Sequence, residues 1–108
     1  MINKVILAGK VSGLKVKVED DGRLATSFTC LYEEPYGEGH VAKLFVPVDV
    51  VTSRAEAIGD AIGDGDLVVI DGRLKWKSWI DKKGEKQGKF AVLAWNVSVL
   101  QPATVSRN

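Results

Sequence analysis

The sequence is poor in the side chains that build redox, metal and hydrolytic sites. Its 108 residues include one cysteine, Cys30, and one histidine, His40. A single cysteine excludes an internal disulfide framework and favours a reducing compartment, and Cys30 is expected to pack as a small hydrophobic residue. His40 has no cysteine or second histidine beside it, which argues against a metal site. With no nucleophile motif or convincing carboxylate pair, we expect no cofactor and no enzymatic activity.

Long apolar runs are also missing. No stretch approaches the roughly 20 residues that a membrane-spanning helix needs, and the first residues lack the features of a signal peptide. We therefore expect a cytoplasmic protein without a membrane partner. With 45% hydrophobic and 27% charged residues, the chain fits one globular domain. We place this domain at residues 1–101 and a short polar C-terminal end at residues 102–108.

Positive charge is concentrated in one segment. The formal net charge is only +1, but residues 73–89 contain seven basic and two acidic side chains. This segment therefore carries +5 and the remainder of the chain −4. A local excess of this kind is typical of a surface that meets a polyanion. A solvated charged hairpin explains the charge equally well, so charge alone leaves both interpretations open.

Short stretches of Val, Ile and Leu, separated by turn residues, predict five strands. The alternation is clearest at Leu14, Val16 and Val18, which are separated by charged side chains. We place the strands at residues 2–18, 24–32, 40–48, 67–80 and 89–100. Residues 33–39 are predicted to form a loop, and residues 81–84 a hairpin connection.

One helix of about ten residues is predicted between the third and fourth strands. Ser53 and Glu56 have the spacing of a capping box. The predicted apolar stripe of the helix consists of Ala57, Ile58, Ala61 and Ile62. Five strands with a helix in this place are what an OB-fold requires, so we predict an all-β, five-stranded Greek-key barrel.

Strand alternation divides residues 73–80 into two faces. One face carries Arg73, Lys75, Lys77 and Trp79, and the other Leu74, Trp76, Ser78 and Ile80. Burying three unpaired cations would cost much free energy, so the first face is predicted to be exposed. Trp79 among cations suits single-stranded nucleic acid, because a ring stacks on any base while cations follow the phosphates. An exposed Trp covered by lysine stems is the alternative interpretation.

The other two tryptophans are interpreted differently. Trp76 points away from the cations and is predicted to lie in the core or at a subunit contact. Trp95, between Leu93 and Val97, is predicted to be buried or interfacial.

Five segments carry a further signal. They are INKVILAG (residues 2–9), ATSFT (25–29), GDLVVIDGRL (65–74), WIDKKG (79–84) and NVSVL (96–100). In this order they resemble segments of the bacterial single-stranded DNA-binding protein (SSB) family. The resemblance implies a nucleoid-associated protein of DNA replication, recombination or repair. It also implies a homotetramer, with a dimer as the second choice.

The resemblance also suggests site residues. Trp79 falls on a base-stacking position of the family, Phe45 on a second aromatic position and Tyr36 on a third, while Val51 stands where a Phe is usual. Phosphates would be neutralised by Arg73, Lys75, Lys77, Lys82, Lys83 and Lys86.

Two departures from the family leave another function open. The acidic tail that recruits replication and repair partners is missing after Gln101, and Val51 weakens the stacking platform. A tail-less domain of this kind also resembles the PriB-like primosomal proteins. The alternative is therefore a replication-restart module that acts mainly through protein partners. RNA binding is a third, weaker possibility.

Overall fold

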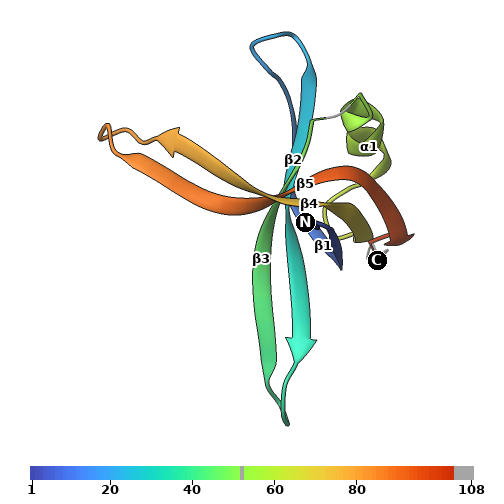
Figure 1. Ribbon diagram of the computed structural model, residues 1–108. Coiled ribbons are helices and arrows are strands. Elements are labelled where there is room, and N and C mark those ends of the chain that lie inside the picture. The colour runs from blue at the N-terminus through green and yellow to red at the C-terminus, as the bar shows by residue number, and fades with distance from the viewer. Residues whose placement is uncertain (52, 104–108) are drawn as a thin grey trace.

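The structure, a computed structural model, describes residues 1–51 and 53–103 as a closed β-barrel with one short helix. The strands are β1 (Val5–Val18), β2 (Leu24–Pro35), β3 (Val41–Val50), β4 (Leu67–Ile80) and β5 (Lys86–Gln101), and the helix is α1 (Ala55–Ala61). Around the barrel the strands follow the order β1-β2-β3-β5-β4 (Figure 1). The predicted five-stranded OB-fold, with its helix between the third and fourth strands, is confirmed. Of the predicted polar end, residues 104–108 lie outside the described residues.

The strand boundaries differ from the predicted ones mainly at the hairpins. β2 and β3 stay paired out to Pro35 and Val41, so the predicted loop of residues 33–39 shrinks to residues 36–40. β5 begins at Lys86, which pairs with Ile80, rather than at residue 89. Backbone pairing requires no apolar side chains, and hydrophobic patterning therefore missed these polar ends of the ladders.

Pairing of β1 with two strands in succession closes one side of the barrel. Residues 5–10 pair with β4 and residues 10–18 with β2. The register of β1 against β2 shifts between Ser12 and Lys15, where Gly13 has a φ of +67° that only glycine adopts without strain. On the other side, parallel pairing of Val48 with Val92 joins β3 to β5. This joint brings the C-terminal end of β3 against the base of the β4–β5 hairpin.

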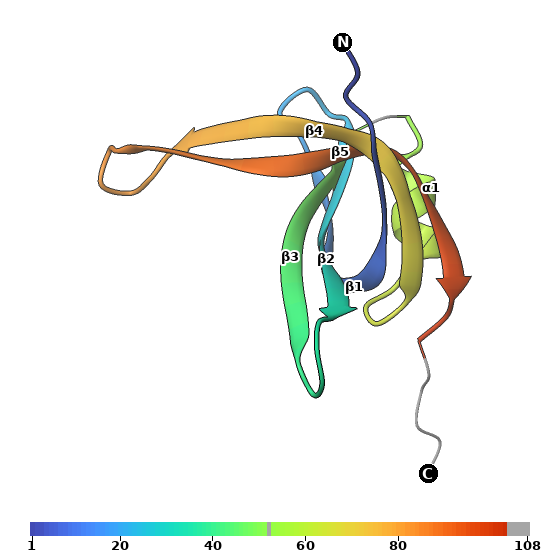
Figure 2. The same cartoon turned by 60° about the horizontal axis from the view of Figure 1, so that its bottom comes forward.

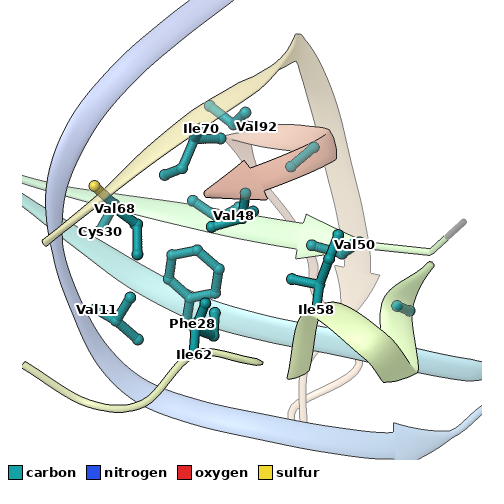
Figure 3. Close-up of a cluster of buried hydrophobic side chains, with 13 residues drawn as sticks. Val11, Phe28, Cys30, Val48, Val50, Ile58, Ile62, Val68, Ile70 and Val92 are labelled. Carbon is teal, nitrogen blue, oxygen red and sulfur yellow. The ribbon is translucent and has the colours of Figure 1, made fainter. Parts of the chain in front are cut away.

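The core consists of the inward-facing side chains of the five strands, closed at one end by α1. Its largest fully buried members are Ile70, Val48, Val50, Val68, Val92, Thr26 and Cys30. Figure 3 shows Phe28 at the centre of this cluster, with Ile58 and Ile62 beside it. Cys30 is 0% exposed and packs as the small hydrophobic residue that the sequence predicts.

The helix is shorter than predicted, and its predicted cap is wrong. It covers seven residues, and its N-cap position is Arg54, whose carbonyl accepts the Ile58 N–H at 2.9 Å. Ser53 thus lies one residue too early, and within the described part of the chain no side chain caps the helix by a hydrogen bond.

The buried face of α1 also differs from the predicted stripe. It consists of Ala55, Ile58 and the following Ile62, whereas Ala57 and Ala61 are exposed. The buried Thr26 hydroxyl donates to the Ala55 carbonyl at 2.6 Å, which fixes this rotation of the helix on β2. Across residues 1–51 and 53–103, no helix has the length and apolar composition needed to cross a membrane.

Three hairpins extend from the barrel in different directions, formed by β1–β2, β2–β3 and β4–β5 (Figures 1 and 2). The β4–β5 hairpin has the predicted turn. Its Asp81 carboxylate accepts hydrogen bonds from the Lys83 and Glu85 N–H groups, both at 2.9 Å. The bond from the Glu85 N–H, followed by one from the Gln87 side chain and by that from the Lys83 N–H, lowers the pKa of Asp81, and together these bonds hold the turn closed.

Candidate nucleic-acid interface

The outward face of β3 lies between two sets of lysines. Because Val46, Val48 and Val50 contribute to the core, strand alternation turns Phe45 and Asp49 away from it. Asp49 pairs with Ser27 of β2, and Ser27 pairs with Lys15 of β1. On the opposite side, β4 brings Lys75 and Lys77 to the same place.

These side chains line two adjacent hollows of about 200 Å³ each, which share Ser27, Asp49 and Lys77. We refer to the two hollows together as the cationic groove. Its five basic side chains are Lys15, Lys17, Lys75, Lys77 and Lys89, and its acidic ones are Asp49 and Glu19. The groove therefore combines cations from three strands, β1, β4 and β5.

Asp49 is the electrostatic centre of this groove. Its Oδ2 atom lies 2.7 Å from the Lys77 Nζ and 3.3 Å from the Lys75 Nζ, and the residue is only 8% exposed. Burial by itself raises the pKa of Asp49, but the hydrogen bond and charge of Lys77, followed by those of Lys75, outweigh burial. The net result is a pKa below the usual value of 3.8, so Asp49 is ionised at neutral pH.

Trp79 lies on the same face of the β4–β5 hairpin as these lysines. It pairs with Gln87, and the Nζ of Lys89 lies 5.7 Å from the centroid of its ring. The side chain is 43% exposed, which leaves part of the ring accessible to a planar ligand. The predicted division of residues 73–80 into two faces therefore agrees with the pairing of the hairpin.

The opposite face of the hairpin is apolar, and it is exposed. Trp76 pairs with Phe90, and their rings meet edge to face with centroids 5.0 Å apart. Both side chains are 60% exposed, so the prediction of a core position for Trp76 is wrong. Trp95 is 40% exposed, so the prediction that it is buried is wrong as well. A subunit contact at either tryptophan stays a prediction.

The other predicted aromatic residues lie on β3 and beyond it. Phe45 is exposed on the outward face of β3, two positions before Pro47, which lines the groove. Tyr36 lies in the β2–β3 turn, where its ring stacks on His40 with centroids 5.5 Å apart. Val51, at the position where the family usually has a Phe, lines the groove itself.

The predicted cations separate into two groups. Lys75 and Lys77 lie in the groove, whereas Lys82, Lys83 and Lys86 are exposed around the turn of the β4–β5 hairpin. Arg73 is exposed at the base of the hairpin, opposite Leu93. The structure thus brings two of the six cations together around Asp49, and the other four follow the hairpin.

Sequence reasoning did not select Lys15, Lys17, Lys89 or Asp49 as site residues. Lys15 and Lys17 alternate with apolar side chains, which shows a strand face but not which strand it meets. Only the barrel order, together with the register shift at Gly13, brings them opposite Lys77. No signal in the sequence links Asp49 to Lys77, 28 positions later in the chain.

Acidic, histidine and cysteine side chains do not gather into a metal site in the part of the chain that the structure describes. Asp64 and Asp66 serve the backbone instead. Asp64 accepts the Leu14 N–H at 2.9 Å, and Asp66 accepts the Gly63 N–H at 2.9 Å and the Ala103 N–H at 2.8 Å.

Comparison with known proteins assigns the barrel to a family. A sequence model of the single-strand binding protein family matches residues 2–100, nearly the whole chain. The chain belongs to this family. The predicted resemblance to SSB proteins is thereby confirmed.

Individual SSB relatives agree with this assignment. The single-stranded DNA-binding protein of Aquifex aeolicus (strain VF5) is 30% identical over 105 residues, which cover 93% of this chain and 71% of the relative. The protein of the same name from Staphylococcus aureus (strain MW2) is 24% identical over 111 residues, covering 100% and 71%. A solved Plasmodium falciparum SSB complex with ssDNA superposes with a TM-score of 0.80 at 17% identity. It covers 94% of this chain and 96% of the solved one, and supports the OB-fold.

Proposed function

We propose that this SSB-family chain binds single-stranded DNA with little sequence preference. The observation that carries the proposal is one outward surface on which exposed Trp79 and the lysines of the cationic groove lie together. A ring and a row of cations match the two features that every single strand offers, which are base faces and phosphates. The names of the relatives from Aquifex aeolicus and Staphylococcus aureus support the same function.

In this proposal the aromatic and cationic residues have different roles. Bases stack on Trp79, Phe45 and Tyr36, each stack contributing about 1–3 kcal/mol. Phosphates are neutralised by Arg73, Lys75, Lys77, Lys82, Lys83 and Lys86. If each of the six cations displaces one counterion from the DNA, a plot of the logarithm of the association constant against the logarithm of salt concentration has a slope of about −4.

We propose further that the chain acts as a homotetramer, with a dimer as the second choice, in DNA replication, recombination or repair. Support comes from large apolar side chains outside the cationic groove, among them Ile6 at 67% and Trp76 at 60% exposure. Such surface is often covered in an assembly. Light scattering tests this directly, because a tetramer has four times the 11.7 kDa of one chain.

A fluorescence titration tests the binding function. In a Trp76→Phe, Trp95→Phe variant Trp79 is the only emitting tryptophan, so that quenching reports on this ring alone. Oligo-dT added at low salt should quench the emission, and added salt should reverse the effect, while a duplex of equal length should quench far less. Unchanged emission, together with no mobility shift of oligo-dT at micromolar wild-type protein, would contradict single-strand binding.

A further inference from the structure

Asp49 occupies a place that does not suit a surface for a polyanion. Its carboxylate lies among the five lysines of the cationic groove and contacts two of them directly. We infer that Asp49 limits the affinity for single-stranded DNA by engaging, as an internal anion, the ammonium groups of Lys75 and Lys77 that a phosphate would otherwise contact. The inference rests on the proposed function.

The geometry makes Asp49 a direct competitor of a phosphate. The Nζ of Lys77 lies 2.7 Å and that of Lys75 3.3 Å from the same Oδ2 atom. A carboxylate and a phosphodiester each carry one negative charge and accept from the same N–H groups. An incoming phosphate must therefore draw each ammonium away from Asp49, or share it.

The competitor cannot leave the groove. Asp49 pairs with Ser27 on one side and with Leu93 on the other, at the joint between β3 and β5 that closes the barrel. The lysine side chains, by contrast, are 24% and 39% exposed for Lys75 and Lys77, so their ends remain accessible to a ligand. The backbone of Asp49 is thus held by both neighbouring strands and its side chain is only 11% exposed, while the ammonium groups can exchange partners.

A positioning role for Asp49 would have the opposite effect. If the carboxylate only held the two lysines in place for the strand, its neutralisation would weaken binding. If it competes, neutralisation strengthens binding. The sign of a single measured change therefore separates the two roles.

The test is Asp49→Asn, which keeps the size of the side chain and removes its charge. At low salt we expect roughly three- to tenfold tighter binding of oligo-dT, because each freed ammonium regains an exposed ion pair. The salt dependence should steepen by about 0.7 for each ammonium released, up to about 1.4 for both. Glu56→Gln on α1 is the matched control, since it changes the net charge equally outside the groove. It should alter affinity less than twofold.

Lysine variants test the same inference without changing Asp49. Lys77→Met in the wild-type background should flatten the salt slope by clearly less than 0.7, because Asp49 already neutralises Lys77. Lys89 lines the groove, has no acidic partner among the described residues and is added here to the six proposed phosphate contacts, so Lys89→Met should flatten the slope by about 0.7. In the Asp49→Asn background, Lys77→Met should approach the effect of Lys89→Met. Melting curves check that each variant is folded.

Several results would overturn the inference. An unchanged or weaker affinity of folded Asp49→Asn, with an unchanged slope, would show that Asp49 does not compete. Equal effects of Lys77→Met and Lys89→Met in the wild-type background would show the same, even if Asp49→Asn did not fold. If wild-type protein did not bind oligo-dT at all, the proposed function would fail together with the inference, whereas the other results would leave single-strand binding intact.

Discussion

Replacement of Trp79 by alanine should weaken binding of single-stranded DNA much more than the same replacement of Trp76. Trp79 lies on the face of the hairpin that carries Lys75 and Lys77, whereas Trp76 lies on the opposite face against Phe90. A stacked base contributes about 1–3 kcal/mol. Part of this gain is offset because the base displaces the Lys89 ammonium from the ring, a contact of about 0.5–1 kcal/mol at an exposed site.

The net loss expected for Trp79→Ala is therefore about 0.5–2 kcal/mol, which is roughly a 2- to 30-fold increase in Kd. Trp76→Ala removes a side chain of the same kind from the same hairpin and should change Kd less than twofold. Fluorescence anisotropy of a labelled oligo-dT measures both values without relying on tryptophan emission. An equal or larger loss for Trp76→Ala would refute the assignment of the binding face.

Three further predictions concern stability and ionisation. A Cβ atom at Gly72 would collide with the backbone carbonyl of Leu93, so Gly72→Ala should lower the free energy of unfolding by about 1–3 kcal/mol in urea denaturation. Gly63→Ala is the control and should have little effect, because the nearest atom to its added Cβ would be the Asp66 carboxylate at 4.0 Å. Burial raises the pKa of the Cys30 thiol to about 11, so a thiol reagent at pH 8 should react with Cys30 only after unfolding, and rapid labelling of the folded protein would contradict this burial. Because the unfolded thiol ionises near pH 9.0 and the folded one near 11, the free energy of unfolding should decline as pH rises from 9.0 towards 11. Because the pKa of Asp49 is lowered in the folded protein, its ion pairs stabilise the fold above pH 3.8, and this stabilisation is lost as pH falls through the pKa of the folded state. Carboxyl NMR should therefore place the titration midpoint of Asp49 below 3.8, and a midpoint above 3.8 would contradict the ion pairs.

The local features of the fold could be predicted from the sequence. The five strands and the turn at Asp81 follow from alternating apolar side chains and turn residues, which act over a few positions. The same alternation separates Trp79 from Trp76, and the β-ladder from Arg73 to Ile80 is regular, so that no register shift exchanges the two faces.

Features that depend on distant segments could not be predicted in this way. Asp49 meets Lys77 only because β3 joins β5 in parallel at the barrel seam, a contact between segments far apart in the sequence. The exposure of Trp76 was missed for a related reason. Its side chain has the polarity of a core residue, but it is 60% exposed on the β4–β5 hairpin. This hairpin extends away from the barrel (Figure 2).

Photochemical cross-linking tests most directly whether a single strand lies on the outward face that carries Trp79 and the cationic groove. An oligonucleotide containing 5-iodouracil, which couples to aromatic rings on which it stacks, is bound at low salt and irradiated, and the adducts are mapped by mass spectrometry. We expect adducts at Trp79 and Phe45. Adducts confined to Trp76 and Phe90, on the opposite face of the hairpin, would contradict the account.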